Sequence, residues 1–239
     1  MDESDNHVGV ASVLRRNALA MLIAAGATVV VQLGTYFIFG GEVALTLLVA
    51  FVWVVVAAPV FAAGGRSVID ALLRGGAVID ASVVVLIVSV SAGPALGLVG
   101  AIKIYLIFCS VAMAGCSLVL LGRNVTSRHI LSAVAVLLIL AIAAGPFWTN
   151  GIITSASASW RERVAFGVRA CNPVFSTIKC LNVGYGFVWN EKPILYEHTV
   201  LGHDVADQSA RWYVTVGVYG IFAFIVGAIA TVRRRADDG

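Results

Sequence analysis

The chain has 239 residues, of which 60% are hydrophobic and only 12% are charged, and its mean hydropathy is +0.96. Soluble globular domains average about 45–50% apolar and about 25% charged residues, so this composition excludes an ordinary soluble domain. The formal net charge of +3 is small and spread over several segments, which argues against a nucleic-acid-binding surface. We therefore expect an integral membrane protein.

Six apolar runs approach the roughly 20 residues that a helix needs to cross about 30 Å of hydrocarbon. Backbone groups in lipid are satisfied only inside helices or closed barrels, and these runs are too long for barrel strands. The predicted fold class is therefore all-α: an integral membrane bundle of six transmembrane helices in one domain, residues 1–239, without an evident internal repeat. In chain order the predicted spans are 18–39, 43–63, 79–95, 98–121, 130–148 and 212–232.

Two of these spans rest on particular residues. The first run follows an acidic leader and continues well past a signal-peptide core of about 7–15 residues, so it is predicted to be a span. Gly93 and Pro94 interrupt the apolar stretch 78–122, which would overshoot the bilayer as a single helix. A tight turn is expected there, and Asp80 is interpreted as a helix cap at the cytoplasmic start of the third span.

Arginine residues predict the orientation of the bundle. Nine of them fall at alternate span junctions: Arg15, Arg16, Arg66, Arg74, Arg123, Arg128 and Arg233 to Arg235. The opposite short loops, "GGE" and "SAGPALG", contain no Lys or Arg. By the positive-inside rule both termini are cytoplasmic, in a multi-pass protein of a cell membrane such as the inner membrane, and the loop 150–211 faces outside. The basic residues of that loop do not determine the orientation, because loops of about 60 residues translocate largely regardless of their charge.

The segment "GGRSVIDALLRGG" carries Arg66, Asp70 and Arg74 at four-residue intervals, which places them on one helical stripe. It predicts a short interfacial helix with an ion pair between Asp70 and Arg74, ended by Gly75 and Gly76. An ordinary connector lying on the membrane surface is the commoner structure for such a segment. The functional alternative is a docking helix on which Arg66, Asp70 and Arg74 contact a cytoplasmic partner.

The loop 150–211 is predicted to contain two short amphipathic helices before the last span. A capping box of Ser159 and Glu162 begins the first, the pair Asn172-Pro173 interrupts the run, and helical spacing resumes as far as Leu181. Cys171 and Cys180 flank the interruption. They are expected either to form a disulfide in an oxidising compartment or to stay free as buried thiols.

No motif in the sequence predicts catalysis or a cofactor. The outer-loop residues Glu197, His198, His203, Asp204 and Asp207 include metal-ligating types, but their spacing matches no established pattern, and a solvated strap is expected. A G-x-S-x-G elbow, a paired-cysteine redox motif and a Walker A loop are all missing from the sequence. Lys103, about six residues into the fourth span, is expected to extend its ammonium to the interface. We therefore expect neither an enzyme nor an ion-coupled transporter.

The predicted layout resembles the permease subunits of ABC-2-type exporters. The resemblance lies in six spans with both ends inside, an amphipathic segment between the second and third spans, and two short outer helices before the last span. It implies a cytoplasmic ATPase as a separate chain, contacted by "RSVIDALLR", and assembly as a homodimer or hetero-oligomer in the lipid bilayer. The competing hypothesis is a non-transporting integral subunit whose outer loop docks a partner protein.

Overall fold

The computed structural model describes residues 10–182 and 211–238, and the only regular secondary structure in these two stretches is helical. The helices are α1 (Val10–Ile38), α2 (Val43–Ala63), α3 (Val68–Ala81), α4 (Val83–Ser91), α5 (Leu98–Leu120), α6 (Val125–Ala143), α7 (Gly145–Ser155), α8 (Ala158–Cys171), α9 (Pro173–Ile178) and α12 (Trp212–Asp238). Among the described residues, six segments are long and apolar enough to cross a membrane. The predicted all-α membrane bundle is confirmed, and the protein is a multi-pass helical membrane protein.

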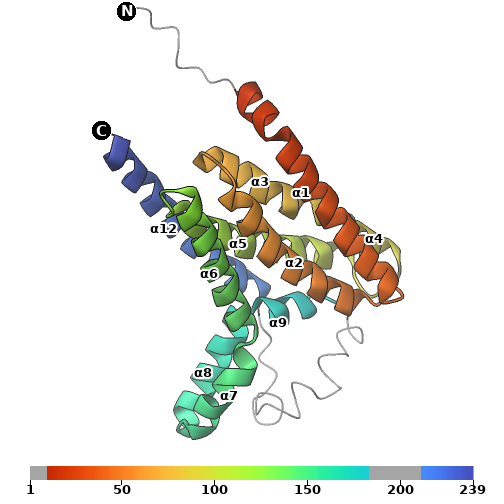
Figure 1. The fold of residues 1–239 in the computed structure, drawn as a ribbon. Coiled ribbons are helices and arrows are strands. Elements are labelled where there is room, and N and C mark those ends of the chain that lie inside the picture. The colour runs from red at the N-terminus through yellow and green to blue at the C-terminus, as the bar shows by residue number, and fades with distance from the viewer. Residues whose placement is uncertain (1–9, 183–210, 239) are drawn as a thin grey trace, which may run out of the picture.

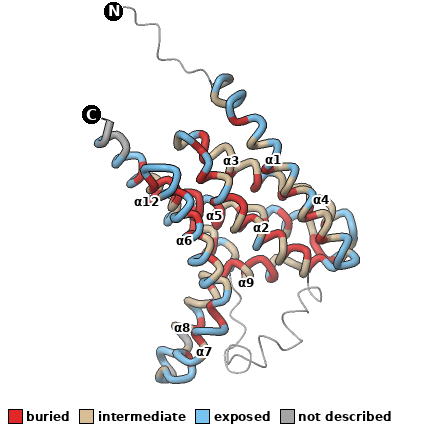
Figure 2. Tube along the Cα trace, in the orientation of Figure 1, coloured by how far each residue is buried: buried red, intermediate tan, exposed pale blue. Residues whose placement is uncertain are grey.

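Two central spans, α2 and α5, hold the core of the bundle. In each of them 61% of the most apolar window is buried, against 17–39% in the other four spans. Helix α1 packs on α2 and α3, and α12 runs along α5 (Figure 1). Buried positions concentrate on α2 and α5 (Figure 2), where the rings of Phe51 and Phe108 lie 6.0 Å apart. The outer spans therefore present most of their apolar surface away from the protein, as lipid-facing helices do.

The two ends of the bundle differ in chemistry. Helix α1 begins, α12 ends, and the α2–α3 and α5–α6 turns lie at the end drawn uppermost in Figure 1. We call this the arginine end, after Arg15, Arg16, Arg66 and Arg128. The opposite end carries α7, α8 and α9 and is called the loop end. Helices α7 and α8 form a hairpin that projects beyond the spans around a small core of Ile153 and Ala165.

The third span begins earlier than the sequence predicted. Helix α3 starts at Val68 and passes through Gly75 and Gly76, and with α4 it forms one apolar segment, Val68–Ser91. The predicted separate interfacial helix is therefore wrong. A Cβ atom at Gly75 would lie 2.7 Å from Cys116 Sγ, so this glycine lets α3 approach α5 closely instead of ending the helix.

Helix breaks at the loop end follow from proline. The predicted fifth span, 130–148, is divided: α6 ends at Ala143 and α7 begins at Gly145, because the ring of Pro146 cannot continue a helix. The two short helices of the loop are confirmed as α8 and α9, with the break at Asn172-Pro173. Helix α8 begins at Ala158 after Ser157, so the predicted capping role of Ser159 is wrong.

Candidate functional site

The α2–α3 turn at the arginine end is built around a buried carboxylate. The Ser67 hydroxyl accepts a hydrogen bond from the Asp70 amide at 3.1 Å, and Asp70 Oδ2 accepts one from the Ser67 amide at 3.0 Å. This reciprocal pair is a capping box that satisfies two amides at the start of α3. Only 1% of Asp70 is exposed, so its charge must be compensated within the protein.

Helix α1 supplies that compensation. The Arg16 guanidinium donates to both carboxylate oxygens of Asp70, at 2.7 and 2.8 Å, and the Asn17 amide donates to Oδ1. Arg74 does not pair with Asp70. It donates to Asn17 Oδ1 at 2.8 Å and to the Gly64 carbonyl at 2.7 Å. The predicted Asp70–Arg74 ion pair is therefore wrong, because α1 packs against α3 and brings in a better placed cation.

The predicted docking stripe is also not a single exposed surface. Asp70 is buried and Arg74 is half-buried in the contact with α1, so Arg66 is the member of the three that is exposed. Arg123, on the neighbouring α5–α6 turn, is exposed at the same end. Arg66 and Arg123, together with Arg15, present a basic surface, which attracts acidic protein surfaces or anionic headgroups.

A buried arginine joins the two turns. Arg128, near the start of α6, is 6% exposed and donates to the carbonyls of Gly122 at 3.1 Å, Arg66 at 3.5 Å and Gly65. Its planar guanidinium carries donors on three separate nitrogens and reaches three carbonyls on two turns, whereas the donors of a lysine all lie on one nitrogen. The α2–α3 turn is thus attached to α1 through Asp70 and to α6 through Arg128.

The α2–α3 and α5–α6 turns share a short sequence motif whose role became evident only from the structure. "GRSV" at 65–68 matches "GRNV" at 122–125, and each turn is closed by a capping box, the second between Asn124 and Ser127. Both glycines are sites of close approach. A Cβ at Gly65 would lie 2.5 Å from the Ala71 amide nitrogen, and one at Gly122 would lie 2.7 Å from Arg128 Cγ. The α2–α3 and α5–α6 hairpins are therefore built alike, although the similarity is too short to read as a repeat.

At the loop end a buried asparagine, Asn172, joins three helices. Its Nδ2 donates to the carbonyls of Ile142 at 3.2 Å and Ala143 at 2.8 Å, which end α6. Its Oδ1 accepts from the amides of Val174 at 2.9 Å and Phe175 at 3.3 Å, which begin α9. Sequence reasoning identified Asn172 only as part of a helix break. The pair Asn-Pro was the available signal, because asparagine is a favoured N-cap and proline favours the first helical position.

We expect Asn172→Ala to lower the free energy of unfolding by about 2–3 kcal/mol, measured by denaturant unfolding of the detergent-solubilised protein. The substitution removes the cap of α9 and the amide donor that Asn172 supplies to the part-buried carbonyls of Ile142 and Ala143 at the end of α6. The matched control is Asn124→Ala, which removes an exposed N-cap and should cost about 1 kcal/mol. Equal losses in the two variants would contradict the role of Asn172.

The last span, α12, forms hydrogen bonds with residues on both sides of the break at Asn172-Pro173. Thr215 Oγ1 on α12 lies 2.5 Å from Ser176 Oγ and donates to the Ala170 carbonyl at 2.8 Å. The Tyr219 hydroxyl donates to the Cys171 carbonyl at 3.2 Å. These contacts place α8 and α9 on α12.

The two cysteines that flank this break are both free thiols, so the disulfide alternative is not formed in this structure. Cys180 lies in the turn after α9, and its thiol donates to the Ser176 carbonyl of that helix at 3.2 Å, which gives it a partner other than Cys171. Burial raises the pKa of Cys180 to about 11, with a small opposing effect of the Lys103 charge. At neutral pH the thiol is therefore almost entirely protonated and a poor nucleophile.

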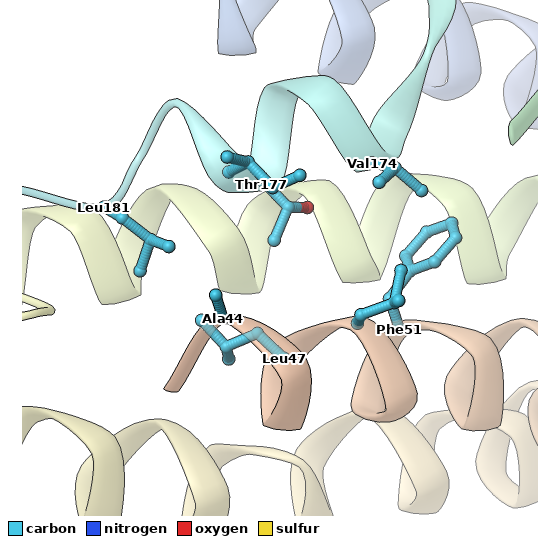
Figure 3. Close-up of a pocket in the computed structure, with 8 residues that line it drawn as sticks. Ala44, Leu47, Phe51, Val174, Thr177 and Leu181 are labelled. Carbon is cyan, nitrogen blue, oxygen red and sulfur yellow. The ribbon is translucent and has the colours of Figure 1, made fainter. Parts of the chain in front are cut away.

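Helix α9 and the residues after it lie over α2. Val174, Thr177 and Leu181 face Ala44, Leu47 and Phe51 across a narrow gap (Figure 3). The space between them is about 10 Å³, which admits about one water molecule and no ligand. This contact is a packed interface between the loop end and the bundle.

The predicted polar cluster of Glu197, His198, His203, Asp204 and Asp207 lies outside the described residues. Within residues 10–182 and 211–238, no three His, Cys, Asp or Glu side chains gather into a group that could hold a metal ion. No protein-family model, curated protein or solved structure matches this chain. Functional inference therefore rests on the residues of the chain itself.

Proposed function

We propose that this chain is the membrane-spanning permease subunit of an ABC-2-type exporter and that a separate ATPase chain docks on its arginine end. In this proposal both termini are cytoplasmic, because the arginines of the short connections gather at the end where α1 begins and α12 ends. The supporting observation is the bonding of the α2–α3 turn. Asp70 attaches it to α1 and Arg128 attaches it to α6.

These bonds give the proposed coupling a physical route. An ATPase that contacts Arg66 and Arg123 through acidic side chains would act on two turns that Arg128 holds together. Because α3 is continuous with the third span, a displacement of its first turn moves that span directly. The buried charges resist separation of the turn from α1, so the displacement reaches α1, α2, α3 and α6 together.

A second candidate function rests on the hairpin of α7 and α8. It projects from the loop end and exposes five large apolar side chains: Phe147, Trp148, Ile152, Trp160 and Phe166. Exposed apolar patches of this kind mark protein or membrane contacts. In this alternative the chain is a non-transporting integral subunit, and the hairpin docks a partner protein.

We expect the double substitution Arg66→Glu and Arg123→Glu to reduce ATPase co-purification at least tenfold, because it reverses the charge of the docking surface. Folding should survive, since both side chains are exposed. Affinity purification from the native host, with mass spectrometry for a chain that contains a Walker A motif, measures the partner, and size-exclusion chromatography measures recovery of the intact protein. The matched control, Arg163→Glu with Arg211→Glu, makes the same charge change at the loop end.

The result distinguishes the two candidates. Loss of the ATPase only in the arginine-end variant supports the permease. A wild-type complex without an ATPase, or one with an ATPase that survives the substitutions, would reject it. Loss of a different partner only in the loop-end variant would favour the non-transporting subunit.

A further inference from the structure

A carboxylate lies in the middle of a membrane span. Asp80 is midway along the 24-residue segment Val68–Ser91, so its predicted position as a cap at the start of the span is wrong. Its side chain is exposed on the surface of the bundle. The Tyr105 hydroxyl of α5 donates to Asp80 Oδ1 at 2.8 Å, and among the described residues Oδ2 has no hydrogen-bond partner. A tyrosine therefore holds one oxygen of a carboxylate that is exposed midway along an apolar span.

Such a residue is costly without a counter-charge. An acidic or basic side chain at the centre of a span costs about 2.5–3.5 kcal/mol on insertion scales, so it is normally paired or functional. No cation of the described residues lies within ion-pair distance of Asp80. Lys103 is two residues from Tyr105 on α5, and side chains at that spacing point to nearly opposite faces of a helix. The described protein thus supplies a hydrogen bond to Asp80 but no positive charge.

An apolar cavity adjoins this carboxylate. It has a volume of about 320 Å³ and lies between α4 and α5, lined by Val83, Leu86, Ile87, Val90, Ala101, Ile102 and Tyr105 among others. Tyr105 is shared by the cavity and the hydrogen bond to Asp80, and Val83 follows Asp80 by one helical turn. Tyr105 therefore connects the carboxylate to a cavity whose walls are almost entirely apolar.

We propose that Asp80, Tyr105 and this cavity bind an amphipathic organic cation. Its positive group lies against the Asp80 carboxylate, and its apolar part fills the space between α4 and α5. The charge of such a ligand removes the cost of the unpaired carboxylate, and the apolar walls match its remainder. A second copy of this chain is a poorer occupant, because a two-fold contact through this face would bring one Asp80 towards the other.

The proposal does not depend on an ATPase partner, so it can fail or succeed independently of the exporter assignment. The probe is tritiated tetraphenylphosphonium, a lipophilic cation, with the full-length protein in lipid nanodiscs and empty nanodiscs as background. We expect saturable binding to the wild type, at least tenfold weaker binding to Asp80→Asn, and about twofold to tenfold weaker binding to Tyr105→Phe. The matched control Glu42→Gln neutralises an exposed carboxylate outside the spans and should bind as the wild type does.

Competition separates charge from hydrophobicity. Dodecylammonium should displace the probe, and dodecanol of the same chain length should not. If Asp80→Asn fails to fold, Ile102→Trp provides a second test, because it replaces an alkyl side chain with a bulky indole ring at the cavity, at a position that is 53% exposed. It should also weaken binding at least tenfold.

Three results would overturn the proposal. The first is wild-type binding no greater than that of empty nanodiscs, and the second is equal binding to the wild type and Asp80→Asn. The third is unchanged binding to Ile102→Trp. A wild-type dimer that dissociates in Asp80→Asn without any binding of the cation would assign this face to self-association instead.

Discussion

Replacing Asp70 by alanine should lower the free energy of unfolding by about 3 kcal/mol, one of the two largest effects expected of a single substitution in this protein. The side chain is buried and accepts hydrogen bonds from Arg16, Asn17 and the Ser67 amide. Removal leaves the Ser67 amide without its acceptor in the capping box and two side-chain donors of α1 without theirs. Breaking a buried, hydrogen-bonded ion pair typically costs about 3–5 kcal/mol. Because the Arg16 side chain is 46% exposed, water can solvate it once Asp70 is removed, so we expect a loss at the lower limit of this range.

The contribution of the Asp70–Arg16 contact to the free energy of unfolding is measured by a double-mutant cycle of Asp70→Ala and Arg16→Ala. Each variant is unfolded by denaturant in detergent. The two losses should be non-additive by at least 1 kcal/mol, because each substitution removes the same contact. Glu42→Ala, at an exposed carboxylate, should change stability by less than about 0.5 kcal/mol. A loss at Asp70 no larger than that at Glu42 would show that the α1–α3 contact does not depend on this charge.

Replacing Arg128 by methionine should also cost about 3 kcal/mol. Methionine keeps much of the apolar volume but leaves the carbonyls of Gly65 and Gly122, both in buried residues, without the guanidinium donor. Arg128→Lys should not rescue the loss, since a single ammonium cannot reproduce the planar fork that joins the two turns. The same unfolding measurement applies. Arg66→Met, at an exposed neighbouring position, is the matched control and should change stability by less than about 0.5 kcal/mol.

Asp70 and Arg128 act on the same turn, so their substitutions test whether it is a rigid connection. If the turn transmits displacement between α1 and α6, Asp70→Ala and Arg128→Met should couple by at least about 0.5 kcal/mol. Strict additivity would mean that the two bonds stabilise separate parts of the protein. The coupled displacement invoked for the exporter would then lose its support.

The sequence by itself determined the class of the protein and its two central spans. The predicted second span matches α2, Val43–Ala63, at both ends, and the fourth differs from α5, Leu98–Leu120, by one residue. Both are continuous apolar runs between turn signals, and burial in lipid or in the core requires the same apolar residues. The helix break at Asn172-Pro173 could also be predicted from the sequence, because proline restricts the backbone of the residue directly before it.

The tertiary structure alone decided what the ambiguous residues do. Gly75 can end a helix or let two helices approach, and the choice depended on Cys116 of α5 facing it. The partner of Asp70 is Arg16, 54 residues away, although Arg74 lies at a favourable local spacing. Continuation of α3 then carried Asp80 from the predicted membrane surface to the middle of a span. Local sequence gives the intrinsic preference of each residue, whereas the partners of a buried charge or a close-packed glycine are set by which helices pack together.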